Sequence, residues 1–375
     1  MNKKRIVSVV GARPNFMKIA PVLLELSHQS EEFASILVHT GQHYDRAMSE
    51  VFFRDLGIKD PDYSLGVGSG SHAVQTAEIM RRFESVCLQE KPELVIVGGD
   101  VNSTLACSLT AAKMHIPVAH VEAGLRSFDR TMPEEINRIV TDSISDLLFT
   151  TENSANRNLQ REGVPEERIH LVGNTMIDSL VRFSGSLNGG PPRVRALSNQ
   201  QYFLATIHRP SNVDEPAQLS KVIEILEAAS ELLPVLFVTH PRTRERLGRL
   251  ERPYRFVEVN EEVREIQPGW IYLLPPLSYL DFLFAMSRTR AVLTDSGGIQ
   301  EETTYLKIPC LTLRENTERP VTVEVGTNEI VGLDRDRILS GLRNIIAGNW
   351  KKASLPPLWD GKAAERIVRV ISRCC

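Results

Sequence analysis

The 375-residue sequence is poor in cysteine, carries little net charge and contains no long apolar run. Its five cysteines show neither C-x-x-C spacing nor histidines at zinc-site spacing, which favours reduced thiols over disulfides or a bound metal. A formal net charge of −3 argues against broad electrostatic binding to nucleic acid or an anionic membrane. No apolar segment reaches membrane-spanning length, and Ile6–Val10, after the basic N-terminal residues, is too short for an export signal. These absences favour a cytoplasmic protein.

What the sequence does contain is an alternation of strand-like and helix-like segments. A chain of 375 residues exceeds the size at which a single core stops growing, so two domains are expected. Amphipathic stretches such as Ala77–Glu90 and Leu219–Leu233 separate short apolar runs, which predicts an α/β fold of parallel, right-handed βαβ units. The predicted strands are Ile6–Val10, Ser35–Thr40, Leu94–Gly98, Val118–Glu122, Leu147–Thr151, Ile169–Gly173, Tyr202–Ile207, Val235–Thr239, Ile271–Leu274, Ala291–Asp295, Cys310–Leu313 and Glu329–Val331.

The predicted boundary between the domains lies near Gly173, after the sixth apolar run. We predict that residues 1–173 form the first domain and residues 174–357 the second. Ser184–Asn199, rich in Gly, Pro and Ser, is expected to be a surface connection. The tail, residues 358–375, has a helical pattern and is expected to cross back and pack on the first domain.

Cations and a glycine follow the first predicted strand, at the end where open parallel sheets bind ligands. Gly11 opens a turn into a predicted helix, and Arg13 and Lys18 lie near its first turns. Helix N-termini and cations both favour phosphate, although a solvated βα turn is the alternative interpretation. The G-x-G-x-x-G fingerprint is absent, so the turn does not indicate a dinucleotide.

Three carboxylates follow later strands of the first half. Asp100 comes after the third strand, Glu122 ends the fourth, and Glu134 follows Pro133 in the next loop. Asp100 is also suited to an N-cap and Glu134 to a first helical turn. Glu122 is harder to explain structurally, because an unpaired carboxylate on a buried strand is costly. The set predicts acid/base chemistry, with metal or ribose binding as alternatives.

The second half offers a histidine and a glycine turn at its strand ends. His208 follows the first strand, and a core histidine or a cap is as good an interpretation as a functional one. In Ser296-Gly297-Gly298 a strand ends and a helix begins, which is typical of a diphosphate site at backbone N–H groups. Glu302, one turn later, is placed to accept ribose hydroxyls, and the segment 314–320 supplies further cations.

Seven segments resemble, in order, motifs of the non-hydrolysing UDP-N-acetylglucosamine 2-epimerases. They are ARPNFMK, TGQHYD, GGDVNSTLA, HVEAGLRS, MPEEINR, DSGGIQEE and RENTERP, and they extend over roughly residues 5–320. The resemblance implies a GT-B-like fold of two Rossmann-like parallel-sheet domains with a cleft between them. It also implies a UDP-sugar substrate, no cofactor and a homodimer.

The resemblance implies an elimination and re-addition at the sugar. UDP and the hydrogen at C2 leave UDP-GlcNAc in an anti elimination that gives 2-acetamidoglucal. UDP and a proton then add back on the opposite face of C2, giving UDP-ManNAc, a precursor of cell-surface polysaccharide. Because the C2 hydrogen is not acidic, cleavage of the C1–O bond must run ahead. Cations and helix-end N–H groups stabilise the leaving diphosphate, and carboxylates move the proton.

The resemblance implies, motif by motif, that the catalytic residues are Asp100, Glu122 and Glu134, with His208 at the diphosphate. Glu135 is the alternative to Glu134. Gln42 and His43 fit the activating second substrate site of many bacterial members, although Gly66–His72 departs from that site's pattern. The residues implied to bind substrate or UDP are Arg13, Lys18, Arg138, Arg209, Phe282, Ser296, Gly297, Gly298, Glu302 and Arg319.

Three other functions are compatible with parts of this pattern. A 2-epimerase acting on another UDP-sugar, such as a diacetamido uronic acid or UDP-glucose, shares every motif. A GT-B glycosyltransferase shares the nucleotide half but does not need three carboxylates in the first half. A catalytically inactive UDP-sugar sensor is disfavoured because Asp100, Glu122, Glu134 and His208 are all present.

Overall fold

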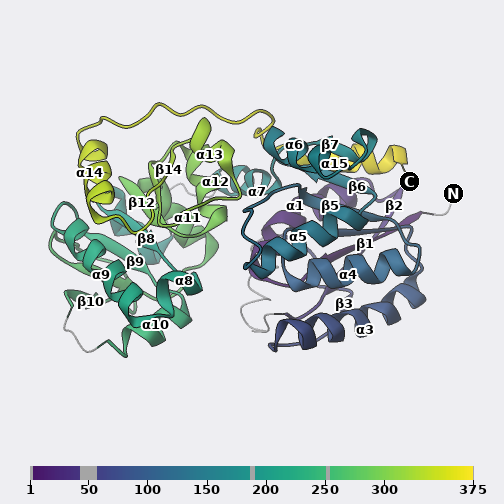
Figure 1. The fold of residues 1–375 in the computed structure, drawn as a ribbon, viewed down its shortest axis with the longest axis horizontal. Coiled ribbons are helices and arrows are strands. Elements are labelled where there is room, and N and C mark those ends of the chain that lie inside the picture. Colours follow the sequence, from purple (N-terminus) through teal and green to yellow (C-terminus); the bar gives the residue numbers. More distant parts are fainter. Residues whose placement is uncertain (1–2, 43–56, 186–190, 251–253, 375) are drawn as a thin grey trace. The chain divides into compact units, whose positions relative to one another are not determined.

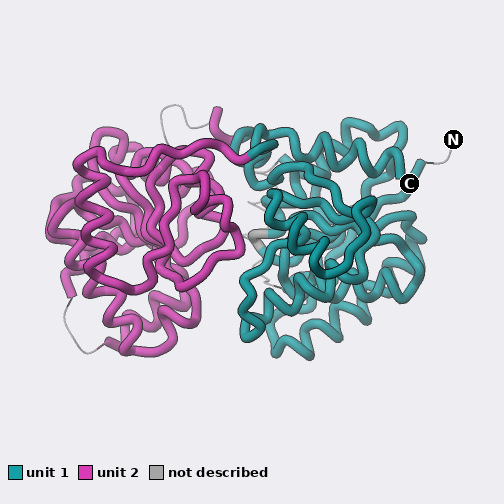
Figure 2. The backbone as a smooth tube through the Cα atoms, turned by 45° about the horizontal axis from the view of Figure 1, so that its top comes forward, with its two compact units in different colours: residues 1–182, 357–375 teal, residues 183–356 magenta. Residues whose placement is uncertain are grey.

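The computed structural model describes residues 3–42, 57–185, 191–250 and 254–374 (Figure 1). The chain divides into two compact units, and Figure 2 distinguishes them by colour. The first unit consists of Met1–Arg182 together with Pro357–Cys375, and the second of Phe183–Pro356. No helix in the described part of the chain combines the length and apolar character that crossing a membrane requires.

The first unit is built on a parallel sheet in the order β3-β2-β1-β4-β5-β6-β7. Its central strands are buried on both faces, as strands covered by helices on each side should be. The strands are β1 (Lys4–Val10), β2 (Phe33–His39), β3 (Tyr63–Ser64), β4 (Leu94–Gly98), β5 (Val118–Ala123), β6 (Leu147–Thr150) and β7 (Ile169–Leu171).

The helices of the first unit begin and end at recognisable local signals. Ser71 caps α3 by accepting a hydrogen bond from the Val74 N–H, and Lys91 ends that helix in the left-handed conformation. The buried face of α3 includes Ile79 and Phe83, one turn apart. The helices are α1 (Arg13–His28), α3 (His72–Glu90), α4 (Asn102–Lys113), α5 (Pro133–Ile144), α6 (Asn153–Arg161), α7 (Thr175–Ser184, continuing to the second unit) and α15 (Ala363–Cys374).

The second unit repeats this architecture with a parallel sheet in the order β10-β11-β9-β8-β12-β13-β14. Its core packs α9 and α14 against β8, β9 and β12. The strands are β8 (Phe203–Thr206), β9 (Val235–Val238), β10 (Phe256–Glu258), β11 (Ile271–Leu274), β12 (Ala291–Thr294), β13 (Cys310–Thr312) and β14 (Asn328–Ile330). The helices are α8 (Pro210–Val213), α9 (Pro216–Ser230), α10 (Pro241–Leu247), α11 (Tyr279–Arg288), α12 (Gly297–Leu306), α13 (Pro320–Glu324) and α14 (Arg335–Ile346).

The predicted α/β class with two parallel sheets is confirmed, and all twelve predicted strands are present. Two further strands were missed, β3 and β10, both of which lie at a sheet edge. In each unit the strand order reverses at one point, between β1 and β4 in the first and between β8 and β12 in the second. The carboxyl ends of strands at such a reversal are where open α/β sheets bind ligands.

The first unit takes its last helix from the far end of the sequence. Helix α15 packs on α1, and Lys4 on β1 donates a hydrogen bond to the Ser372 carbonyl oxygen. Trp359, which is 2% exposed, donates from Nε1 to the Thr151 carbonyl oxygen over 3.0 Å. The division between the units falls after Arg182, so most of helix α7 belongs to the first unit.

Asp178 on α7 holds the N-terminus of α15. Its carboxylate accepts hydrogen bonds from the N–H groups of Ala363 and Ala364, at 3.1 and 2.7 Å. Burial raises the pKa of Asp178 to about 6, even though those two N–H groups act in the opposite direction. Helix α15 is therefore held by a carboxyl group that the fold favours in its protonated form.

This raised pKa predicts how stability depends on pH. A group whose pKa is higher in the folded than in the unfolded chain contributes stability at low pH, which is lost as pH rises through the folded value. Asp178→Asn removes the titration. Between about pH 4 and about pH 7, the wild-type free energy of unfolding is expected to fall by about 2–3 kcal/mol relative to this variant, as measured by urea unfolding. A constant difference across that range would contradict the assignment.

Candidate active site

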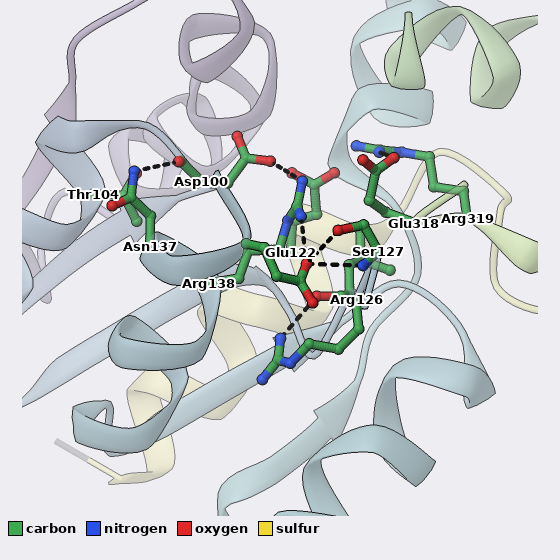
Figure 3. Close-up of polar contacts among 12 residues, drawn as sticks. Asp100, Thr104, Glu122, Arg126, Ser127, Asn137, Arg138, Glu318 and Arg319 are labelled. Atoms are coloured by element: carbon green, nitrogen blue, oxygen red, sulfur yellow. Dashed lines mark hydrogen bonds and ion pairs between the residues drawn. The ribbon is translucent and has the colours of Figure 1, made fainter. Parts of the chain in front are cut away.

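In the first unit, the predicted carboxylates lie at the carboxyl ends of neighbouring strands. Asp100 follows β4 and precedes α4, and Glu122 is the last residue but one of strand β5. Glu134 and Glu135 are in the first turn of α5. Figure 3 shows how α5 presents Arg138 towards Asp100, so that helix and strand ends form one polar cluster.

Glu122 stands where β5 departs from regular geometry. Its φ angle is +72°, and the pairing of β5 with β6 shifts register between Val121 and Ala123. A non-glycine residue held in this region is strained, and such strain concentrates at functional sites. The Glu122 side chain is 5% exposed and forms an ion pair with Lys18 on α1, which is itself almost fully buried. Lys18, predicted from the sequence to meet the ligand, thus has its ammonium group against a catalytic candidate.

Gly99 gives this ion pair the room that it needs. A Cβ atom at Gly99 would lie 2.7 Å from Nζ of Lys18 and 3.4 Å from Oε2 of Glu122. Its φ of +66° also favours glycine. The turn that carries Asp100 is therefore packed directly against the buried ion pair of the next strand.

Arg138 and Asn137 hold Asp100 from α5. The Arg138 guanidinium forms ion pairs with Asp100 and, over 3.0 Å, with Glu135. Asn137 Nδ2 donates to the Asp100 carbonyl oxygen over 2.9 Å. Arg138, predicted from the sequence to meet the ligand, is 4% exposed and holds a catalytic candidate through this ion pair.

The neighbouring carboxylates Glu134 and Glu135 have different surroundings. Glu135 is 1% exposed, and its carboxylate accepts hydrogen bonds from the N–H and hydroxyl of Ser127 and from the N–H of Phe128, at 2.8 to 3.0 Å. With Arg138 added, its oxygens are committed to holding the loop after β5. Glu134 is half-buried. These surroundings assign the structural role to Glu135 and leave Glu134 as the candidate for chemistry.

Isosteric substitutions are expected to separate the two roles. Glu135→Gln should lower the free energy of unfolding by about 1–3 kcal/mol, because one acceptor oxygen becomes a donor that faces N–H groups. Glu134→Gln should change stability by less than about 0.5 kcal/mol and lower turnover about 10²-fold. Thermal unfolding and steady-state rates of both variants provide the measurement. Wild-type turnover in Glu134→Gln would remove that residue from the mechanism.

In the second unit, Asp295 organises the turn after β8. Its carboxylate is fully buried and accepts hydrogen bonds from the N–H groups of His208 and Arg209 and from Nδ2 of Asn212, at 2.9 to 3.1 Å. Nδ1 of His208 lies 3.4 Å from Asp295 Oδ1. The His208 side chain is 40% exposed, so it is oriented by a buried acid while remaining accessible.

Gly297, predicted to contact a diphosphate, lies against the guanidinium of Arg319. A Cβ atom there would lie 2.4 Å from Nη1 of Arg319, so the glycine admits that guanidinium to the N-terminus of α12. Arg319 is also paired with the buried carboxylate of Glu301, at 2.8 Å. Arg209 lies 3.6 Å from Glu318, which pairs with Arg314 as well. Cations and the start of α12 thus meet at the carboxyl end of β12, an arrangement that favours anions.

The other candidates of the second unit lie on α11 or α12 or at the start of α12. Glu302 is 2% exposed and accepts a hydrogen bond from the Tyr279 hydroxyl over 2.9 Å. Ser296 is the N-cap position of α12 and makes no side-chain cap bond. Phe282 is half-buried on α11.

The two allosteric candidates have different outcomes. Gln42 is buried, and its Oε1 accepts from the N–H and hydroxyl of Ser103, so its amide fixes the start of α4. His43 lies outside the described residues. Arg13 is the first residue of α1, and its side chain also lies outside the described part.

Three organising residues were missed in the sequence, namely Asp295, His120 and Asp142. Asp295 carried a signal, because an acid closes the apolar run Ala291–Thr294. His120 interrupts the apolar run of β5 in the same way, whereas nothing local marks Asp142. Within the described ranges, no three His, Cys, Asp or Glu side chains gather as metal ligands do.

Comparison with known proteins gives a consistent result. The family model described as UDP-N-acetylglucosamine 2-epimerase matches residues 25–372. The UDP-N-acetylglucosamine 2-epimerase of Methanocaldococcus jannaschii is 40% identical over 373 residues, 97% of this chain and 98% of its own. The UDP-2,3-diacetamido-2,3-dideoxy-D-glucuronate 2-epimerase of Pseudomonas aeruginosa is 39% identical, with 98% and 99% covered. The crystal structure of the M. jannaschii UDP-GlcNAc 2-epimerase with UDP-GlcNAc and UDP superposes with a TM-score of 0.86, at 39% identity and 98% and 99% coverage.

The two parallel sheets, with acids at the strand ends of one and cations at those of the other, define an enzyme of the GT-B-like α/β class. The chain belongs to the UDP-N-acetylglucosamine 2-epimerase family, and the predicted family is confirmed. The protein is accordingly an isomerase of the epimerase type.

Proposed function

We propose that this protein interconverts UDP-GlcNAc and UDP-ManNAc by inversion at C2. One observation carries the proposal: Asp100 and Glu122, each held by a buried cation, end two adjacent strands at the reversal of the first sheet. Support for the substrate comes from the relatives named UDP-N-acetylglucosamine 2-epimerase and from the related crystal structure that contains UDP-GlcNAc and UDP.

In the first step of the proposed reaction, the C1–O bond breaks and UDP takes its electron pair. The C2–H bond then breaks, its electrons form the C1=C2 double bond of 2-acetamidoglucal, and a carboxylate accepts the proton. Arg209, Arg319 and the start of α12 stabilise the diphosphate, with His208 beside them. Asp100, Glu122 and Glu134 supply the proton acceptor and the donor on the two faces of C2.

In the second step, UDP adds back to C1 and a proton is delivered to the other face of C2. The formal oxidation changes at C1 and C2 cancel in the elimination and are reversed in the re-addition, so this route needs no external oxidant or reductant such as a nicotinamide. The proposed ligand-binding set is completed by Arg13, Lys18, Phe282 and Glu302. Lys18 contributes through its ion pair with Glu122. The proposal includes a homodimer in the cytoplasm that supplies precursors of cell-surface polysaccharide.

A second candidate substrate is a UDP-diacetamido uronic acid. It is favoured by the similarity to the Pseudomonas aeruginosa epimerase, which is 39% identical to this chain, compared with 40% for the Methanocaldococcus jannaschii epimerase. The chemistry at C1 and C2 is the same, so the proposed residue roles do not change.

The test is an NMR assay of each UDP-sugar in heavy water. The proposal expects deuterium at C2 of both epimers without any acceptor. A glycosyltransferase needs an acceptor and leaves C2 unlabelled, and a sensor leaves the sugar unchanged. Label in the diacetamido uronic acid alone would select the second candidate.

A further inference from the structure

His120 is a fully buried histidine in the middle of β5, two residues before Glu122. Its Nε2 lies 2.8 Å from the Gly99 carbonyl oxygen, and its Nδ1 lies 2.6 Å from Oδ1 of Asp142 on α5. Both ring nitrogens therefore have a short contact with an oxygen, and no water is needed to satisfy either.

The contacts fix where the protons of this histidine lie. A carbonyl oxygen only accepts, so Nε2 carries the proton in its contact with Gly99. A proton must also lie between Nδ1 and the carboxylate of Asp142, because two lone pairs at 2.6 Å repel each other. Burial raises the pKa of Asp142, but His120 and Arg126 outweigh it and bring that pKa below its ordinary value. The pair is thus a charge-assisted hydrogen bond in the protein interior.

Surrounding groups balance the charges of this pair. Arg126 is buried, and its Nη1 lies 2.7 Å from Oδ2 of Asp142. Its Nε and Nη2 donate to both oxygens of Glu162, at 2.8 and 2.6 Å. Arg126 thus links the pair to Glu162, and the proton between His120 and Asp142 lies in a chain of alternating donors and acceptors.

The pair contacts the backbone of both turns that carry the catalytic candidates. Gly99 directly precedes Asp100, and its carbonyl oxygen is the acceptor for His120. Gly124 is two residues beyond Glu122, and its N–H donates to Asp142 over 3.0 Å. Gly99, Glu122 and Gly124 all have positive φ. The backbone of these turns lies outside the regular hydrogen bonding between strands, so side chains must satisfy and fix its N–H and C=O groups.

We propose that His120, oriented by Asp142, is a positioning residue that sets the turn bearing Asp100 relative to Glu122 for catalysis. This inference rests on the proposed epimerase activity. Displacing a catalytic group by about 1 Å costs about 10²-fold in rate, whereas ligand groups on the second unit do not depend on this turn. The expected signature is a fall in kcat with little change in UDP binding.

Two amide substitutions of His120 separate its two contacts. A Gln side chain reaches as far as Nε2, so His120→Gln retains a donor for the Gly99 carbonyl and loses the bond to Asp142. An Asn side chain reaches only as far as Nδ1, so His120→Asn retains the bond to Asp142 and leaves Gly99 without its donor. Both amides are uncharged, and each keeps one of the two hydrogen bonds.

The experiment compares both variants with the wild type for deuterium uptake, kcat, UDP affinity by calorimetry and thermal unfolding. We expect His120→Asn to lower kcat about 10²-fold and His120→Gln less than about 10-fold, with UDP affinity within about twofold in both. This order should hold whichever variant melts lower. Equal kcat in the two variants, or kcat that follows the melting temperature alone, would overturn the inference. If the wild type labels no UDP-sugar, the proposed function fails instead. Should Asn at position 120 prevent folding, a kcat of His120→Gln within about 10-fold of the wild type despite a lower melting temperature supports the positioning contact, and a 10²-fold loss of kcat there refutes it.

Discussion

Glu122→Gln is expected to lower deuterium uptake at C2 by at least about 10³-fold, while UDP still binds with nearly wild-type affinity. The amide keeps the shape of the side chain but neither accepts the C2 proton nor offsets positive charge at C1. UDP affinity is expected to persist because its proposed ligands, such as Arg319 and α12, belong to the second unit. The measurements are the heavy-water NMR assay and calorimetry with UDP.

This variant also leaves Lys18 buried beside a neutral partner. Removing one member of a buried ion pair costs about 3–5 kcal/mol, so a loss of folding must be separated from a loss of chemistry. The double variant Lys18→Met with Glu122→Gln removes both charges and is expected to recover stability without recovering turnover. Glu84→Gln, an exposed acid on α3, is the matched control and should have wild-type rates. A stable double variant with wild-type turnover would exclude Glu122 from the reaction.

Trp359→Ala is expected to lower the free energy of unfolding of the first unit strongly. The indole is almost fully buried in the first unit, and its N–H satisfies the Thr151 carbonyl oxygen. Truncation creates a cavity and removes that donor, at a cost of about 3–5 kcal/mol and roughly 10 °C in melting temperature. Differential scanning calorimetry provides the measurement.

The same substitution elsewhere in the chain serves as the control. Trp270 is 42% exposed, so Trp270→Ala is expected to change the melting temperature by less than about 2 °C. Trp359→Phe refills much of the cavity without the N–H and should fall between the two. Equal melting temperatures for the two alanine variants would show that the return of α15 contributes little to the first unit.

The sequence was sufficient for the strands and for most strand-end residues, because parallel strands buried on both faces appear as continuous apolar runs. It was insufficient for β3 and β10, since two or three residues at a sheet edge leave no such pattern. The cost of a buried carboxylate at Glu122 was foreseen, and the structure supplies the compensating cation, Lys18. This ion pair joins α1 to β5, which are far apart in the sequence, so only the folded chain shows it.

Long-range contacts account for the remaining differences. The turn at Gly297 predicts a phosphate contact from its local sequence, and only the folded chain shows that Arg319 lies beside it. Asp142 lies in the last turn of α5 and resembles any surface acid in the sequence, yet it is fully buried against His120. Residue type alone does not distinguish a side chain that contacts a ligand from one that holds another side chain in place.

The position of α15 has a consequence for synthesis on the ribosome. Residues 183–356 are translated before α15, so the second unit has its complete sequence while α1 still lacks the helix that packs on it. Chains fold progressively as they are made, and the first half must therefore wait in an incomplete state with apolar surface uncovered. A nascent chain arrested before Trp359 is expected to be captured by chaperones through its first unit, although that unit began to emerge first.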